Sequence, residues 1–353
     1  MKGLVLQGGG AKGAYEAGAI KALNKRRIFF DVVGGTSIGA INAACYVTRQ
    51  YNNMCKLWLS ATSKELFGID EGLIKNIDSK NLKKGDLKKG FALLRSVLKN
   101  GGIDVNNIKT FLEKNISEKR FRLSKIDYCM NTFNITDFKR VDVFKKDIPE
   151  GKLHEYILSS AYLPFFKFEK IIDDKYYLDG GVITNCPVDL LIDHGCDEVY
   201  VIKAWQERIR FKNKTNAKVN IIGPRENLGS ILLFEKETAE YRMNLGYYDT
   251  IKFLDNLDGN KYYFKSYSEE YYSRLFDKTT YKRMVKKYNN SIPPRSYKFF
   301  IIKTIEQICN QQKINRFKVY NLPYLLTRLK YLLAGKKDNK YYDFIKSIKV
   351  DFE

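Results

Sequence analysis

Short apolar runs alternate with amphipathic stretches over the first fifty residues. Gly3–Gln7 is an apolar run that ends in three glycines, and Asp31–Gly35 is a second run of the same kind. Small and apolar residues then recur at helical spacing over about Ala11–Leu23 and again over Ile38–Thr48. A short apolar run predicts a buried strand, and a period near 3.6 predicts a helix. The pattern therefore predicts two strand–turn–helix units, which are typical of a parallel α/β sheet.

The rest of the chain continues this alternation. Further strands are predicted over Tyr128–Ile135, Arg140–Phe144, Tyr176–Leu178, Val199–Lys203 and Val219–Ile222. Helices are predicted over Asp104–Ile116 with a cap near Asn106, over His154–Tyr162, over Pro187–His194 with proline at the first helical position, and over Glu235–Leu254. Lys80–Lys89 is expected to be a basic loop.

Composition excludes several classes of protein. With 353 residues, of which 44% are hydrophobic, the chain can bury a large core. No apolar run approaches the roughly 18 residues of a membrane span, the N-terminus lacks a secretory signal, and Lys2 excludes N-myristoylation. The six cysteines show no metal-finger spacing. We therefore expect no metal site, a reducing compartment and a cytoplasmic location.

Charge is distributed unevenly. The net charge is +22, of which residues 201–353 contribute +15, and 13 of the 25 tyrosines follow residue 250. This shift indicates an organisational boundary, followed by a basic C-terminal region rich in lysine and tyrosine. We expect peripheral contact with an anionic membrane surface through segments such as Tyr281–Tyr288 and Tyr324–Lys337. The alternative is a small helical subdomain with solvated lysines. No nucleic-acid-binding motif is present.

The first glycine turn has two interpretations. Gly8, Gly10 and Gly13 match the dinucleotide fingerprint, and Asp31 follows at nearly the spacing of a ribose-binding acid. However, Asp31 begins the second strand, whereas the ribose acid lies at the far end of that strand. A turn without side chains at a helix N-terminus also presents backbone N–H groups to an oxyanion. Lys12 would add a positive charge there.

A second turn, Gly35-Thr36-Ser37-Ile38-Gly39, has the G-x-S-x-G pattern. That pattern places a serine on a sharp strand-to-helix turn and exposes its Oγ as a nucleophile. The alternative is a structural turn with an N-capping serine.

A nucleophilic serine needs a base. The chain has two histidines, His154 and His194, and the order Ser37, Asp179, His194 would suit a Ser–Asp–His triad. Both histidines lie at predicted helix ends rather than in loops that suit catalysis. Asp179 follows a predicted strand and precedes two glycines, which makes it the better candidate base. The alternative is an ordinary Asp-Gly turn.

Three motifs in this order, GGGAKG at 8–13, GTSIG at 35–39 and DGG at 179–181, resemble the patatin-like phospholipase family. The resemblance extends to residues 159–164, to Asn185 and Pro187, and to residues 220–229 and 244–247. It covers about residues 1–257, which we therefore expect to form one domain, and residues 258–353 are expected to form a separate basic, Lys/Tyr-rich helical region. One departure is Lys12, where many members carry arginine.

The resemblance implies a three-layer α/β/α sandwich with a mostly parallel central sheet, followed here by a helical C-terminal extension. It also implies hydrolysis of phospholipid or other glycerolipid acyl esters by a Ser37–Asp179 dyad, without cofactor or metal. The oxyanion hole would comprise Gly8, Gly9, Gly10, Ala11, Lys12 and Gly13. The nucleophile elbow would comprise Gly35, Thr36, Ile38 and Gly39, and the acid loop Gly180 and Gly181.

Two alternatives stay open: a non-catalytic or latent lipid-binding protein, and an oxidoreductase that binds a nucleotide through Gly8–Gly13.

Overall fold

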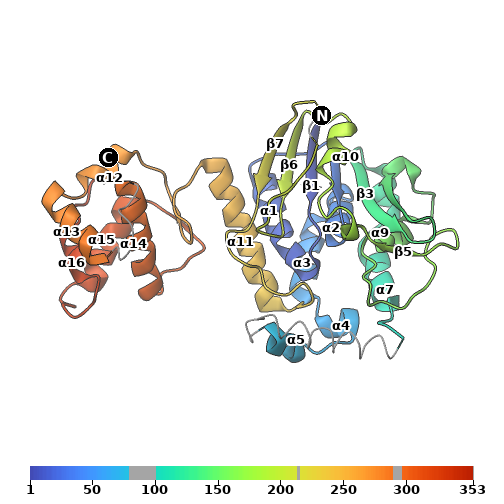
Figure 1. Cartoon of the computed structure of the whole chain (residues 1–353), viewed down its shortest axis with the longest axis horizontal. Coiled ribbons are helices and arrows are strands. Elements are labelled where there is room, and N and C mark those ends of the chain that lie inside the picture. The colour runs from blue at the N-terminus through green and yellow to red at the C-terminus, as the bar shows by residue number, and fades with distance from the viewer. Residues whose placement is uncertain (79–100, 213–214, 289–295, 353) are drawn as a thin grey trace. The chain divides into compact units, whose positions relative to one another are not determined.

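The computed structural model describes residues 1–78, 101–212, 215–288 and 296–352. The predicted Lys80–Lys89 loop lies outside these ranges. The chain forms two compact units, Met1–Thr250 and Ile251–Glu353 (Figure 1).

The first unit is built on a mixed, mostly parallel sheet. Its strands are β1 (Lys2–Leu6), β2 (Val32–Gly35), β3 (Asp127–Asn134), β4 (Lys139–Phe144), β5 (Tyr177–Asp179), β6 (Glu198–Ile202) and β7 (Lys218–Ile222). The order across the sheet is β4-β3-β2-β1-β6-β7, and β5 pairs with β3. The strands β1, β2, β3, β6 and β7 pair in parallel, whereas β4 and β5 run antiparallel to β3. These strands confirm the predicted alternation.

Helices connect and cover these strands. They are α1 (Gly13–Lys25), α2 (Ile38–Val47), α3 (Tyr51–Ser60), α4 (Ser63–Phe67), α5 (Glu71–Asp78), α7 (Asn106–Asn115), α8 (Glu118–Leu123), α9 (Leu153–Ser160), α10 (Val188–Asp193) and α11 (Lys236–Asp255). Two predicted helix starts were wrong. The helix expected from Ala11 begins at Gly13 because Gly10–Lys12 forms a 3₁₀ turn, and Pro187 precedes α10 rather than opening it. The first turn of α7 is bound by Asp104, whose carboxylate accepts from the Asn106 N–H.

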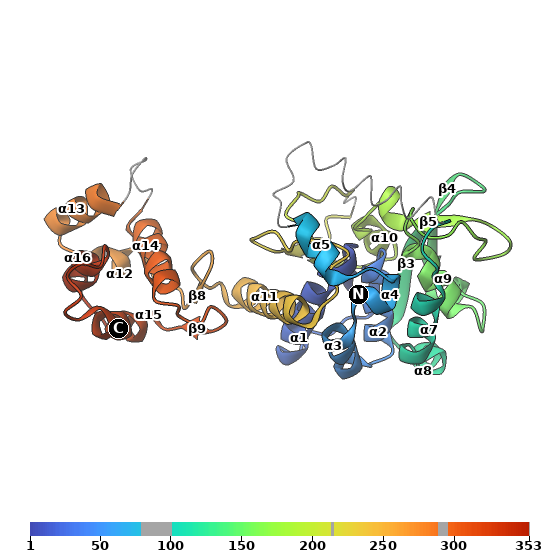
Figure 2. The ribbon, with the colours of Figure 1, turned by 90° about the horizontal axis from the view of Figure 1, so that it is seen from below.

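The helices form two layers around the sheet. Val5 packs in a core with Leu191 of α10. Successive side chains on a strand face opposite ways, so Leu6 points to the other face, where Gly39 of α2 lies against it. Figure 2 shows α1, α2 and α7 along one side of the sheet and α10 along the other. The first unit is therefore the predicted three-layer α/β/α sandwich.

The second unit is mostly helical. It contains α12 (Glu269–Arg274), α13 (Lys278–Tyr288), α14 (Tyr297–Gln311), α15 (Leu322–Leu333), α16 (Tyr342–Ser347) and a short parallel pair, β8 (Tyr263–Phe264) and β9 (Val319–Tyr320). Leu325, Leu326 and Leu329 of α15 are buried in its core, whereas Tyr324 and Tyr331 are exposed. Among the described residues, no helix has the length and apolar composition that a bilayer span requires.

Candidate active site

The turn after β2 holds Ser37 in an unusual backbone conformation. Its φ is +58° and its ψ is −128°, outside the regions that residues with a Cβ favour. The flanking glycines make this turn possible. A Cβ at Gly35 would lie 2.4 Å from the carbonyl carbon of Gly39, and one at Gly39 would lie 2.2 Å from the Leu6 carbonyl oxygen. The G-x-S-x-G segment therefore forms a sharp strand-to-helix turn, with Ser37 at the N-terminus of α2.

Strand β3 brings Asp179 to this turn. The first half of β3 pairs with β2, where Met130 lies opposite Gly35, and its second half pairs with β5, where Thr132 lies opposite Asp179. Because the two partners occupy the same side of β3, the end of β2 and the end of β5 meet beside it. Residues more than 140 positions apart in sequence thereby become neighbours.

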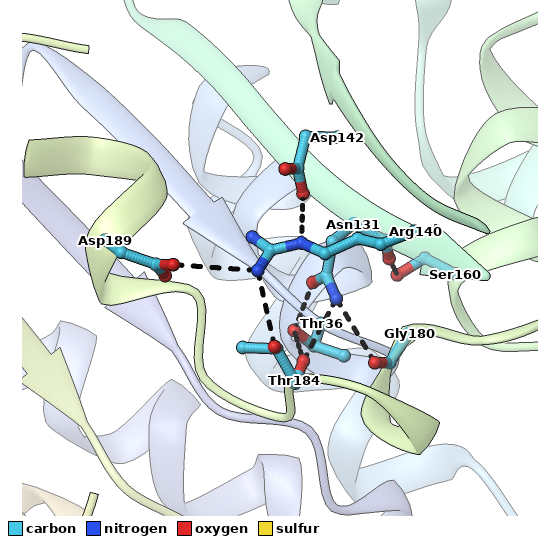
Figure 3. A network of polar contacts seen from close by, with 8 residues as sticks. All are labelled: Thr36, Asn131, Arg140, Asp142, Ser160, Gly180, Thr184 and Asp189. Atoms are coloured by element: carbon cyan, nitrogen blue, oxygen red, sulfur yellow. Dashed lines mark hydrogen bonds and ion pairs between the residues drawn. The ribbon is translucent and has the colours of Figure 1, made fainter. Parts of the chain in front are cut away.

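Asn131 joins the two turns at this meeting point. Its side-chain Oδ1 accepts a 2.5 Å hydrogen bond from Thr36 Oγ1, and its Nδ2 donates to the carbonyls of Gly180 and Thr184. Figure 3 shows the Asn131 side chain among these three partners. Asn131 is fully buried, so its amide is held to the serine turn on one side and to the acid loop on the other.

The same network extends in two directions (Figure 3). Ser160 Oγ donates to the Asn131 carbonyl and accepts the backbone N–H of Ser37 at 3.0 Å. Arg140 of β4 donates to Thr184 Oγ1 and to Asp142. No sequence motif marks Asn131 or Arg140, because their role depends on the register of β3 with its neighbours.

The Asp179 carboxylate is nearly enclosed. It is 6% exposed and accepts a 2.7 Å hydrogen bond from the Gly181 N–H. Burial raises its pKa from 3.8 to about 6, against the nearby Ser37 side chain and the Gly181 N–H, which both lower it. A carboxylate with this pKa is ionised near neutral pH, yet it is a stronger base than an exposed aspartate.

The first glycine turn lies against Ser37. A Cβ at Gly8 would lie 3.1 Å from the Ser37 Cβ and 2.2 Å from Asn185 Oδ1. The N–H of Gly8 is bound by the carbonyl of Asn185, and the Ala11 N–H is bound by Ile231. The N–H groups of Lys12 and Gly13 are bound within the turn. Among the described residues, no acceptor meets the N–H of Gly9 or Gly10.

Lys12 is buried rather than exposed on the first turn of a helix. Its Nζ lies 3.2 Å from the centroid of the Trp205 ring, a cation–π contact. The indole N–H of Trp205 donates to the Gly8 carbonyl at 2.8 Å. Trp205 therefore contacts both ends of the turn, and no sequence motif marks it.

An apolar pocket opens beside Ser37. It encloses about 810 Å³, part of which is open to solvent. Of its described lining residues, Asn42 and Asn115 are the amides, and most others are aliphatic or aromatic. The rings of Trp58 and Phe234 stack in its wall at 5.7 Å. The pocket is shaped for a long apolar group attached to a polar reacting centre.

Asn42 is bound on all sides. Its Nδ2 donates to the Gly13 carbonyl and to Glu16 Oε2, and its Oδ1 accepts from the Trp58 indole. Burial raises the pKa of Glu16 well above 4.5, against the hydrogen bond from Asn42, which lowers it. The amide of Asn42 therefore ties α1, α2 and α3 together behind the pocket.

The remaining candidates lie elsewhere. His194 Nε2 lies 3.0 Å from Asp127 at the start of β3, whereas Ser37 follows the C-terminal end of the parallel strand β2. His154 Nε2 lies 2.8 Å from the Ile116 carbonyl oxygen. The Ser–Asp–His interpretation is therefore wrong. Asp31 accepts the backbone N–H of Lys2 before β2 begins, far from the glycine turn, which does not fit a ribose-binding acid. In the described ranges, no cluster of three metal-ligating side chains occurs.

Comparisons with known proteins identify the family of this chain. A family model described as patatin-like phospholipase matches residues 4–192. Patatin-like phospholipase domain-containing protein 6 of Mus musculus is 27% identical over 203 residues, 56% of this chain and 13% of that protein. Lysophospholipase NTE1 of Mycosarcoma maydis is 28% identical over 200 residues, 57% of this chain and 9% of that protein. The chain thus matches less than a fifth of each of these relatives.

Among solved structures, the crystal structure of VipD from Legionella pneumophila aligns with a TM-score of 0.41 at 15% identity, covering 98% of this chain and 87% of that one. The family match spans more than half of the chain and includes the serine turn, the glycine turn and the acid loop. The chain belongs to the patatin-like phospholipase family.

Proposed function

We propose that the protein hydrolyses acyl esters of phospholipids or other glycerolipids, with Ser37 as nucleophile and Asp179 as general base. The observation that carries this proposal is that strand β3 brings the buried Asp179 carboxylate to the Ser37 turn, with Ser37 lining an apolar pocket. A serine hydroxyl becomes an effective nucleophile when an adjacent base takes its proton.

The reaction would proceed through an acyl-enzyme. The Ser37 proton moves to Asp179 as the Oγ–carbon bond forms, and the carbonyl π electrons move onto its oxygen. The tetrahedral intermediate collapses, the ester C–O bond breaks, and the departing alkoxide takes the proton from Asp179. Water then attacks the acyl carbon, gives a proton to Asp179 and releases the fatty acid. Ser37 recovers its proton from Asp179.

Within the part of the chain that the structure describes, the hydrogen bonds of the glycine turn limit which of its N–H groups could donate to an oxyanion. Of the six residues expected from the sequence, Gly9 and Gly10 have N–H groups that are available to a new acceptor. The N–H groups of Gly8, Ala11, Lys12 and Gly13 are already bound, so these residues would shape the hole rather than donate to the oxyanion. The Lys12 charge adds to the positive potential near the turn.

The substrate assignment draws on the pocket and on the relatives. The relatives carry the names phospholipase and lysophospholipase, and the apolar lining suits a fatty acyl chain. The net charge of +22 favours approach to an anionic lipid surface. Peripheral membrane contact is therefore part of the proposal.

A fluorophosphonate tests the nucleophile directly, because it phosphonylates activated serines. Intact mass of the full chain should show one adduct, and peptide mapping should place it on Ser37 rather than on the neighbouring Ser160. Labelling is measured with and without anionic vesicles. An adduct elsewhere would contradict the assignment of Ser37. No adduct under either condition would favour the alternative of a non-catalytic lipid binder.

The labelling rate is expected to rise with pH through about pH 6. Asp179 accepts the Ser37 proton only when ionised, and its pKa is raised to about 6 by burial. Below about pH 6 the labelling rate should fall about tenfold for each unit that the pH falls, and above about pH 6 the rate should be constant. Labelling from about pH 4.5 to about pH 8 measures this curve. A rate independent of pH across that range would mean that another group takes the proton.

A further inference from the structure

Arg242 of α11 is a buried cation that no sequence motif marks. It is 1% exposed and is among the largest fully buried side chains. Its position is fixed by backbone packing between α11 and α1. A Cβ at Gly18 would lie 1.9 Å from the Met243 carbonyl oxygen, and one at Gly246 would lie 1.9 Å from the Tyr15 carbonyl oxygen. The two helices touch at these glycines, so the arginine is held in one place.

The guanidinium binds four backbone carbonyls. Its Nε donates to Leu228 at 2.8 Å and its Nη2 to Ser230 at 2.9 Å. Its Nη1 donates to Leu233 at 3.2 Å and to Ala11 at 2.9 Å. Three of these carbonyls belong to the loop before α11, and the fourth belongs to the glycine turn beside Ser37. Arg242 therefore joins the loop and the turn through one rigid, planar group.

The loop before α11 also contacts the glycine turn directly. The Ile231 carbonyl accepts the Ala11 N–H at 2.7 Å. A Cβ at Gly10 would lie 2.3 Å from the same oxygen, and Gly10 has a φ of +53°. Gly10 therefore takes a left-handed conformation directly under a carbonyl that Arg242 helps to place.

A chain of two peptide groups connects Arg242 to the free N–H of Gly10. The Ala11 carbonyl shares a peptide group with the Lys12 N–H, which donates to the Gly9 carbonyl at 3.1 Å. The Gly9 carbonyl shares a peptide group with the Gly10 N–H. Hydrogen bonds in series polarise one another, so a cation at one end strengthens the donor at the other.

We propose that Arg242 is a positioning residue that orients and polarises the Gly10 N–H toward the oxyanion. The inference rests on the proposed function, since it assumes that Ser37 attacks an ester carbonyl. Arg242 does not touch the substrate; it acts through Ala11, Lys12 and Gly9. Its effect should therefore appear in the reaction rate and not in lipid binding.

Three variants test this role: Arg242→Gln, which removes the charge, Arg242→Lys, which keeps it, and Arg122→Gln as a matched control. Arg122 also donates to two backbone carbonyls, those of Ile148 and Pro149, but is remote from the glycine turn. The fluorophosphonate labelling rate of Arg242→Gln should fall by on the order of 10²-fold, the effect of losing one oxyanion donor. Arg242→Lys should stay within about tenfold of wild type, and the control should not change.

Binding to vesicles of non-hydrolysable dialkyl phosphatidylcholine separates positioning from folding. Wild type and all three variants should bind within about twofold of one another. If the labelling rates of Arg242→Gln and Arg242→Lys fell equally, the positive charge at this position would have no role. A loss of vesicle binding in proportion to the loss of labelling would overturn the positioning role.

Amide hydrogen exchange over residues 8–13 gives a readout independent of activity. Exchange should be faster in Arg242→Gln than in Arg242→Lys, because the turn loses its anchor. Identical exchange in wild type and both variants would overturn the proposal. A wild-type chain that fluorophosphonate never labels would instead overturn the proposed function, and the exchange comparison would still decide the role of Arg242.

Discussion

Replacing Asp179 with asparagine is expected to lower turnover of an acyl ester by on the order of 10³-fold. Asparagine can still accept the Gly181 N–H, so the acid loop keeps its shape, but it cannot take the Ser37 proton. Initial rates on a short-chain ester and on a phospholipid measure the effect. Ser37→Ala supplies the background rate.

Asp142→Asn is the matched control for this variant. Asp142 is also a carboxylate whose pKa is raised by burial, and it binds Arg140 rather than Ser37. Its asparagine variant should keep activity within about threefold of wild type. If Asp179→Asn retained comparable activity, the general base would lie elsewhere and the dyad would be wrong.

The same Asp179→Asn change is expected to stabilise the fold at about pH 8. Burial raises the pKa of Asp179 from 3.8 to about 6, so between these values the folded protein holds a proton that the unfolded chain has lost. Stability therefore falls as pH rises through this window. The difference between the two pKa values lowers the free energy of unfolding by about 3 kcal/mol above pH 6. Asparagine does not ionise, so the variant does not lose this stability. Urea unfolding should show the gain at about pH 8 and no gain below about pH 4.

Gly246→Ala is expected to destabilise the first unit by about 3 kcal/mol or more. The new methyl group would lie 1.9 Å from the Tyr15 carbonyl oxygen, and a backbone atom cannot move aside as a flexible side chain can. Helices α1 and α11 would have to separate, which would also strain the hydrogen bond between Tyr15 and Asp249. Urea unfolding of the full chain measures the loss.

Gly72→Ala makes the same chemical change in another helix. Among the described residues, a Cβ at Gly72 would meet the flexible Asp70 carboxylate, at 2.8 Å, and no backbone atom within 4 Å. Alanine favours helix over glycine, so stability should stay the same or rise by less than about 1 kcal/mol. Equal losses in both variants would mean that the contact between α1 and α11 does not limit stability.

The sheet and the two glycine turns could be predicted because their signals are local. A short apolar run predicts a strand wherever its neighbours lie, and the glycines at 35 and 39 are required by contacts within one turn and its adjoining strand. Asp179 could be chosen as the candidate base from the predicted strand before it and the two glycines after it, and the resemblance to a family then implied the same role.

The groups that hold the site together could not be predicted, because each depends on distant partners. Asn131 matters only because β2 and β5 pair with the same side of β3. Arg242 matters only because α11 packs on α1 at two glycines. Which N–H groups of the first turn remain free is decided by carbonyls of Asn185 and Ile231.

The position of β1 between β2 and β6 also sets when the site can exist during protein synthesis. The glycine turn is synthesised before its supports, because β6, the Ile231 carbonyl and Arg242 follow about 190 to 230 residues later. At about 5–20 residues per second, the growing chain spends on the order of ten seconds or more with a complete serine turn and no support for the glycine turn. If the proposed function is right, acyl-ester hydrolysis begins only when nearly all of the first unit has been made.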